Sequence, residues 1–163
     1  MSQLVLLPHK DRSLARRHPW IFAGAVDRLD GRARPGDTVE VVAANGRPLA
    51  KAAWSPASKI RARVWTFDPA EVVDDAFFKR HVQAALERRQ SIPELRFHDG
   101  LRLLHGESDG LPGVIADRYG DTVVLQLTAA GADRWRRAII GALQRASGCA
   151  RIYERSDSDV RRL

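Results

Sequence analysis

The chain has 163 residues, enough for one large domain or two small ones, and 44% of them are hydrophobic, which is ordinary for a globular protein and excludes global disorder. Its apolar runs are far shorter than the roughly 18 residues that a membrane helix needs. The net charge is +7, and the whole excess lies in residues 1–66, which hold twelve Lys and Arg against five Asp and Glu. Such an asymmetry indicates a polyanionic partner for the first part of the chain, with a merely solubilising surface as the alternative.

The first 25 residues combine a short strand, a short helix and a turn. Leu4–Leu7 is an apolar run that predicts a first strand. Asp11–Arg17 predicts a helix of one to two turns, with Asp11 or Ser13 as N-cap and Pro19 as its stop. Because a proline disfavours the helical conformation of the residue before it, the chain is expected to turn at His18.

Residues 38–67 show the period of two that is typical of strands. Thr38–Val42 and Pro48–Trp54 flank Asn45-Gly46, which is a strong hairpin signal. Lys59–Phe67 alternates, with Lys59, Arg61, Arg63 and Trp65 on one face. Short strands, one small helix and tight turns predict a small β-barrel over residues 1–66.

A second domain is predicted for residues 67–163, where composition and charge balance change. It should contain a helix from Asp74 or Asp75 to about Gln90 and a second helix over residues 131–146 that ends at Gly148. Its predicted strands cover residues 101–105, 114–119, 122–127 and 151–154. The fold class is therefore α+β: a small β-barrel, then a small α/β domain with two helices and a mainly antiparallel sheet, without a complete Rossmann domain. Arg155–Leu163 has no closing structural signal, so we expect the natural chain to continue.

Seven cations in the first domain are the candidate contacts to a nucleic acid, and one tryptophan joins them. Arginine binds phosphate in a bidentate way, and an exposed aromatic ring can stack on an unpaired base. The alternative for each tryptophan is a place in the barrel core, which we favour for both Trp20 and Trp65. The RNA-binding candidates are Lys10, Arg12, Arg16, Arg17, Trp20, Lys59, Arg61 and Arg63.

His105, Glu107 and Asp109 lie within five residues and could in principle carry out acid–base chemistry. However, the glycines and the proline around them predict a tight turn, in which Asp109 bonds to the local backbone. We therefore favour a structural turn and predict no catalytic residue in the chain.

No cofactor or metal site is predicted. A nucleotide or S-adenosylmethionine pocket would require a glycine-rich loop between a strand and a helix, whereas Gly110 and Gly113 lead into a strand. The five histidines are scattered, and Cys149 is the single cysteine, so no metal-ligand spacing occurs. A lone cysteine cannot form an internal disulfide and points to the cytoplasm.

Four strings occur in an order that resembles a known family. The strings lie at residues 16–25, residues 54–58 with 60–64, residues 106–113 and residues 153–157. In these strings the chain resembles the N-terminal half of the bacterial class I S-adenosylmethionine-dependent ribosomal RNA large-subunit methyltransferases, which act on cytosine C5 of 23S rRNA.

The resemblance implies that residues 1–66 form an RNA-binding PUA domain and that residues 67–163 link it to a methyltransferase domain. The cofactor site and the catalytic cysteine would then lie in that further C-terminal domain, so this chain alone is expected to be inactive. S-adenosylmethionine is implied for the full-length family only. The expected partners are 23S rRNA and the methyltransferase domain, with a homodimer also open. The alternative is a stand-alone PUA-type interaction or dimerisation module without catalysis.

Overall fold

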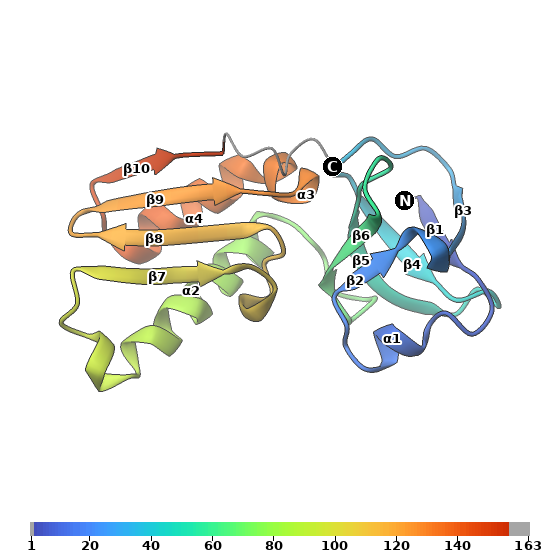
Figure 1. The fold of residues 1–163 in the computed structure, drawn as a ribbon, viewed down its shortest axis with the longest axis horizontal. Coiled ribbons are helices and arrows are strands. Elements are labelled where there is room, and N and C mark those ends of the chain that lie inside the picture. The colour runs from blue at the N-terminus through green and yellow to red at the C-terminus, as the bar shows by residue number, and fades with distance from the viewer. Residues whose placement is uncertain (1, 157–163) are drawn as a thin grey trace. The chain divides into compact units, whose positions relative to one another are not determined.

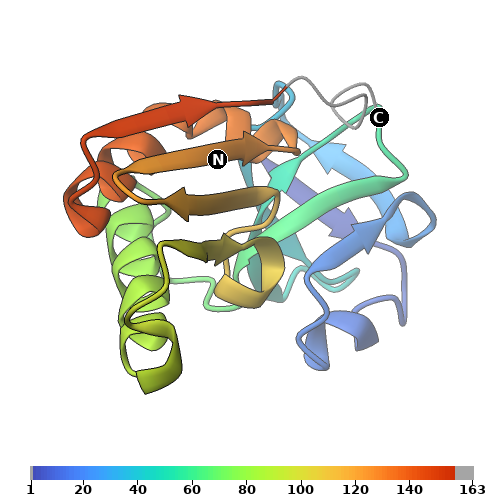
Figure 2. The same cartoon turned by 60° about the vertical axis from the view of Figure 1, so that its left-hand side comes forward.

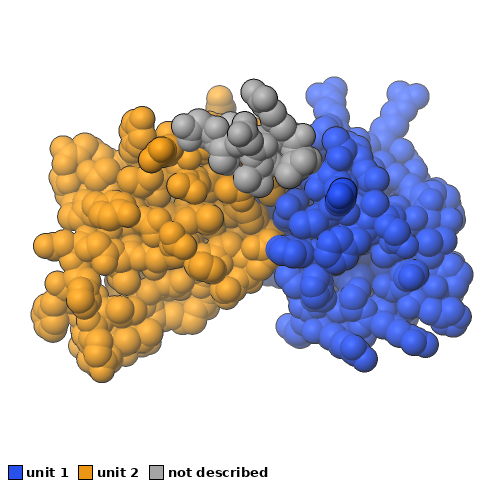
Figure 3. All heavy atoms as spheres, viewed as in Figure 1, with its two compact units in different colours: residues 1–73, 163 blue, residues 74–162 orange. Residues whose placement is uncertain are grey.

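A computed structural model describes residues 2–156. These residues form two compact units with the boundary between Val73 and Asp74 (Figure 3). The tail beyond residue 156, where the sequence predicts a continuation of the chain, lies outside the described residues.

The first unit is a curled sheet with one short helix against it (Figure 1). Its strand order is β2-β6-β5-β4-β1-β3, in which β1 and β4 are parallel and the other pairs are antiparallel. In chain order the elements are β1 (Gln3–Leu6), α1 (Arg12–Ala15), β2 (Trp20–Phe22), the 3-10 turn η1 (Ala23–Ala25), β3 (Val26–Asp30), β4 (Thr38–Val42), β5 (Pro48–Trp54) and β6 (Ile60–Thr66).

The core of this unit follows from the alternation of its strands. Leu4 and Leu6 of β1, Val39 and Val41 of β4, and Ala62 and Val64 of β6 point inward, and Leu14 of α1 covers them. Because successive residues of a strand face opposite sides, the residues between these positions are directed away from the core. The hairpin at Gly46, whose φ is +81°, is confirmed.

The second unit is a four-stranded sheet with helices on one face (Figures 1 and 2). Its strand order is β10-β9-β8-β7, in which β10 and β9 are parallel and the other pairs antiparallel. The elements are α2 (Asp75–Gln90), η2 (Pro93–Leu95), β7 (Gly100–His105), η3 (Gly106–Asp109), β8 (Val114–Tyr119), β9 (Thr122–Leu127), α3 (Ala130–Arg134), α4 (Arg136–Ser147) and β10 (Arg151–Glu154).

The α+β fold class is confirmed, and the differences are local. The predicted helix over residues 131–146 is two helices, because the backbone leaves the helical region at Trp135, with φ −95° and ψ 13°. The strands β2 and β3 were not predicted, since β2 has only three residues and the half-buried positions of β3, Val26 and Leu29, do not alternate. The N-cap at Asp74 is confirmed: its carboxylate accepts a hydrogen bond from the Phe77 N–H at 2.8 Å.

Candidate nucleic-acid interface

The helix α1 ends in a Schellman motif that turns the chain into β2. The N–H of Arg17 donates to the carbonyl of Leu14 at 2.8 Å, and the N–H of His18 donates to that of Ser13 at 2.9 Å. These two bonds place Arg17 in the left-handed region, with φ +57°, where glycine is the usual residue. Asp11 is the N-cap residue of α1, which confirms one of the two predicted positions, but its side chain makes no capping hydrogen bond. The Asp11 carboxylate instead pairs with Arg47 at 3.0 Å.

The strand β2 places its middle residue in the core and its two ends on the opposite face. Ile21 is 2% exposed and belongs to the core, whereas Trp20 is half-buried and Phe22 is 48% exposed. The core position predicted for Trp20 is therefore wrong, since the period of two gives that place to Ile21. Trp65 is buried, in agreement with its prediction, although it lies outside the core cluster of this unit.

Three rings form an aromatic cluster on the outer face of β2. The Trp20 ring meets the rings of His18 and Phe22 edge to face, with centroids 5.9 Å and 6.2 Å apart. His18 Nδ1 also accepts a hydrogen bond from the Trp20 N–H at 3.2 Å. This aromatic cluster (His18, Trp20, Phe22) presents partly exposed ring faces, which is the arrangement that stacking on unpaired bases requires.

The pairing of β2 with β6 places cations beside this aromatic cluster. Trp20 is the cross-strand partner of Arg63, and Arg61 lies on the same face of β6 two residues earlier. The carbonyl of Lys59 accepts a hydrogen bond from Ala23 N–H, just after β2. Arg17 lies over the ring of Phe67, 5.7 Å from its centroid, which brings the end of α1 to the end of β6.

The structure separates the eight candidate residues into two groups. Trp20 and the cations Arg61 and Arg63 lie where β2 pairs with β6, and Lys59 directly precedes β6. Arg16 and Arg17 lie at the end of α1, just before β2. Lys10 and Arg12 instead flank Asp11, whose partner Arg47 belongs to the β4–β5 hairpin. None of Lys10, Arg12, Arg16, Lys59 and Arg61 forms an ion pair with another residue in the described part of the chain, so their charges are available to an anion.

Sequence reasoning missed His18 and Phe22 as members of this face. The sequence did hold a signal for this: an aliphatic residue, Ile21, lies between two aromatic ones, Trp20 and Phe22. Over three residues this is the alternation expected of a strand with one buried face. The β2–β6 face is our name for the aromatic cluster together with the cations that chain position and strand pairing bring near it: Arg16 and Arg17 after α1, and Lys59, Arg61 and Arg63 at or in β6.

The second candidate, the turn over residues 105–113, is occupied by structural contacts. Asp109 is buried, and its carboxylate accepts two hydrogen bonds from Arg89, one from Arg88 and one from the His105 N–H, each at 2.7 Å. Burial raises the pKa of Asp109, but the hydrogen bonds from Arg89, Arg88 and His105 outweigh burial, so the pKa lies below that of an ordinary aspartate. The carboxylate is therefore a charged link between the turn and α2 and is not free for acid–base work.

The glycine at the end of this turn allows a close approach to the start of α3. A Cβ atom on Gly113 would lie 2.5 Å from the Cβ of Ala129, and its φ of +76° disfavours any other residue. The glycines and the aspartate of residues 106–113 are therefore explained by how the turn packs against α2 and the start of α3. Among residues 2–156, no group of His, Cys, Asp and Glu has the geometry of a metal site. No helix in that range is long and apolar enough to cross a membrane.

The fold of the first unit corresponds to a known class: residues 4–67 match the family of PUA-like domains. The chain as a whole is 52% identical over 160 residues to ribosomal RNA large subunit methyltransferase I of Salmonella arizonae and, equally, to that of Cronobacter sakazakii. Each match covers 98% of this chain and 40% of the relative. The chain thus contains a PUA-like domain, is homologous to these methyltransferases, and spans about 40% of their length.

Two solved structures share the fold. A chain from Streptococcus mutans, assigned as a SAM-dependent methyltransferase, superimposes with a TM-score of 0.80 at 18% identity, covering 96% of this chain and 41% of the other. A methyltransferase structure solved with S-adenosylhomocysteine also gives 0.80, at 19% identity and with 40% of that chain covered. At such identity the likeness supports the fold only.

Proposed function

We propose that this chain is the RNA-recognition part of a ribosomal RNA large-subunit methyltransferase that transfers a methyl group from S-adenosylmethionine to cytosine C5 of 23S rRNA. Residues 1–66 would bind RNA, and residues 67–163 would link them to a methyltransferase domain outside this chain. The cofactor and the catalytic residues would belong to that domain. A cytoplasmic location follows from a ribosomal RNA substrate.

The observation that carries the proposal is the β2–β6 face. Arg16, Arg17 and Lys59 of this face are exposed, and Arg61 and Arg63 are half-buried. Such cations can neutralise phosphates, and the aromatic cluster can stack on a base. The homology to rRNA methyltransferases supplies the class of RNA. Arg28 provides a contrast within the same unit, because it pairs with both Asp27 and Asp30 and so contributes little net charge to a partner.

RNA binding at several salt concentrations tests the proposal. For the double variant Arg16→Gln/Arg61→Gln, we expect the slope of log K against log salt to become shallower by up to about 1.4 for a single-stranded 23S rRNA fragment, because two phosphate contacts would be lost. Trp20→Ala should weaken binding by about 1–3 kcal/mol and leave the slope unchanged, because stacking releases no counterion.

Arg32→Gln/Arg34→Gln is the matched control, since both arginines are exposed and follow β3, a strand that pairs with neither β2 nor β6. If the control flattens the slope as much as the double variant does, RNA binding depends on the overall charge of the first unit and not on the β2–β6 face. Salt-insensitive self-association without RNA binding would instead support the dimerisation module.

A further inference from the structure

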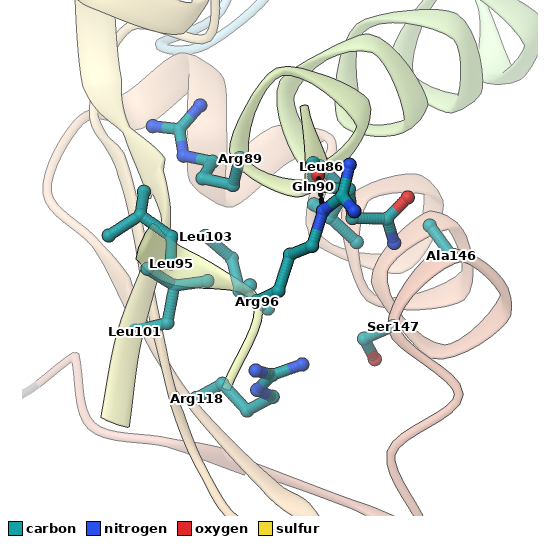
Figure 4. A pocket seen from close by; sticks show the side chains of 10 residues that line it. All are labelled: Leu86, Arg89, Gln90, Leu95, Arg96, Leu101, Leu103, Arg118, Ala146 and Ser147. Carbon is teal, nitrogen blue, oxygen red and sulfur yellow. Dashed lines mark hydrogen bonds between the residues drawn. The ribbon is translucent and has the colours of Figure 1, made fainter. Parts of the chain in front are cut away.

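A cavity of about 180 Å³ lies within the second unit, where α2 and α4 end beside the sheet (Figure 4). Four leucines and three arginines contribute to its lining, together with Gln90 and Ser147, and no carboxylate does. This combination of apolar wall and cations is typical of a site for an anion attached to a larger molecule.

Two of the three arginines keep charge for a ligand. Arg89 is neutralised by Asp109. Arg96 donates from Nε to the carbonyl of Gln90 at 2.9 Å, and Arg118 donates one terminal N–H to the carbonyl of His98 at 3.0 Å. Neither Arg96 nor Arg118 forms an ion pair with another described residue.

These carbonyl bonds explain where the two side chains lie, because cations commonly cap the carboxyl end of a helix or loop. They leave both terminal nitrogens of Arg96 and two donor groups of Arg118 unused by described residues. In Figure 4 the Arg96 side chain points toward Gln90 and the Arg118 side chain points toward Ser147. An anion between them could therefore accept from two guanidinium groups and from the amide and hydroxyl groups opposite.

The size of the cavity and the residue beside it indicate what the anion is attached to. A cavity of about 180 Å³ has room for a phosphate group. Phe97, the residue after Arg96, is 92% exposed, so its ring is open to solvent and to a stacking base. Glu94 and Asp99 of the same loop do not line the cavity.

We propose that this cavity binds one backbone phosphate of an RNA strand through Arg96 and Arg118, while the neighbouring base stacks on Phe97. The RNA would then contact the second unit as well as the β2–β6 face. The identity of the ligand as RNA rests on the proposed function; the phosphate site itself does not.

The test has two probes, inorganic phosphate and a single-stranded 23S rRNA oligonucleotide, both added to the whole 163-residue chain. With phosphate, we expect saturable shifts of the Arg96 and Arg118 Nε–H signals in nitrogen–proton NMR spectra. With RNA, Arg96→Gln/Arg118→Gln should make the salt slope shallower by up to about 1.4. Phe97→Ala should weaken binding by about tenfold at an unchanged slope. Because Phe97 is exposed, this variant tests the site without disturbing the fold.

Lys79→Gln/Arg137→Gln is the matched control, since it removes two exposed cations from α2 and α4 outside this cavity. It should change the slope less than the cavity variant does.

Unchanged RNA binding in both Arg96→Gln/Arg118→Gln and Phe97→Ala, with an intact effect of Arg16→Gln/Arg61→Gln, would overturn the second contact and leave the proposed function standing. Phosphate shifts without any RNA binding would overturn the proposed function and assign the cavity to a free phosphate. Absence of phosphate shifts would overturn the site itself.

Discussion

Arg17 holds a left-handed backbone conformation that is more costly for arginine than for glycine. A residue with a Cβ pays about 1 kcal/mol there, because the Cβ approaches the following carbonyl oxygen. The Schellman bonds of α1 and the contact with Phe67 keep Arg17 in place despite this cost. Strain of this kind is often retained where a side chain has a function, which agrees with a phosphate-binding role for Arg17.

Comparison of Arg17→Gly with Arg17→Ala isolates this strain at the level of one residue. Both variants lose the charge and the contact with Phe67, so they differ mainly in backbone cost. We expect Arg17→Gly to be more stable than Arg17→Ala by about 1 kcal/mol in urea unfolding, which reverses the usual order within a helix. Equal stability would mean that the chain relaxes at this position and stores no strain.

At the scale of elements, the link between α2 and the turn before β8 depends on one buried charge. Arg89 binds Asp109 through two parallel bonds and also donates to the carbonyls of Arg102 and Ala85. The residues involved are about 20 positions apart in sequence, so the link closes a loop that includes β7. The buried ion pair stabilises the fold only while both partners are present. Without the Asp109 carboxylate, the Arg89 guanidinium would stay desolvated with no opposite charge to compensate it.

Asp109→Asn should therefore destabilise the chain by about 3 kcal/mol at pH 7, measured by chemical unfolding. Since the folded-state pKa of Asp109 is lowered, its contribution is complete above the pKa of an unfolded aspartate and is lost as pH falls through the folded-state value. The difference between the wild-type chain and Asp109→Asn should shrink below about pH 4. A difference that stays constant down to pH 2 would contradict this assignment. Asp121→Asn is the control, because that carboxylate is exposed and pairs with the exposed Arg151.

At the scale of the whole molecule, each of the two units has a sheet of its own. The core of the first is built from β1, β4, β5 and β6 around Ile21, and the second is built from α2, α4 and its own sheet, with Phe77 and Phe78 fully buried. Units of this kind need not unfold in one step.

We expect amide hydrogen exchange of Asp109→Asn to show this independence. Exchange at pH 7 should accelerate across α2 and β7–β9, because their link is weakened, and remain unchanged in β4–β6. Val41→Ala in the first core should give the reverse pattern. Acceleration across the entire chain in both variants would mean that the two units unfold together.

Much of the fold could be predicted because its signals are local. The Asn45-Gly46 turn, the Asp74 cap and the alternation of β4, β5 and β6 each act within a few residues, so the strands, the long helix and the α+β class follow from the sequence. The basic character of residues 1–66 also needs no structure, since charge is a property of composition. The boundary of α3 and α4 and the short strands β2 and β3 were missed, because their patterns are weak and tertiary contacts decide them.

The tertiary structure alone decided which of these residues act together. The pairing of β2 with β6 sets Trp20 opposite Arg63 and turns Ile21 inward, and no local rule specifies the register of strands that are 40 residues apart. The same holds for the link between Asp109 and Arg89 and for the cavity beside Arg96 and Arg118. The sequence by itself determined the elements and the sign of the charge, because both arise within short segments; the β2–β6 face and the phosphate cavity arise only when distant segments meet.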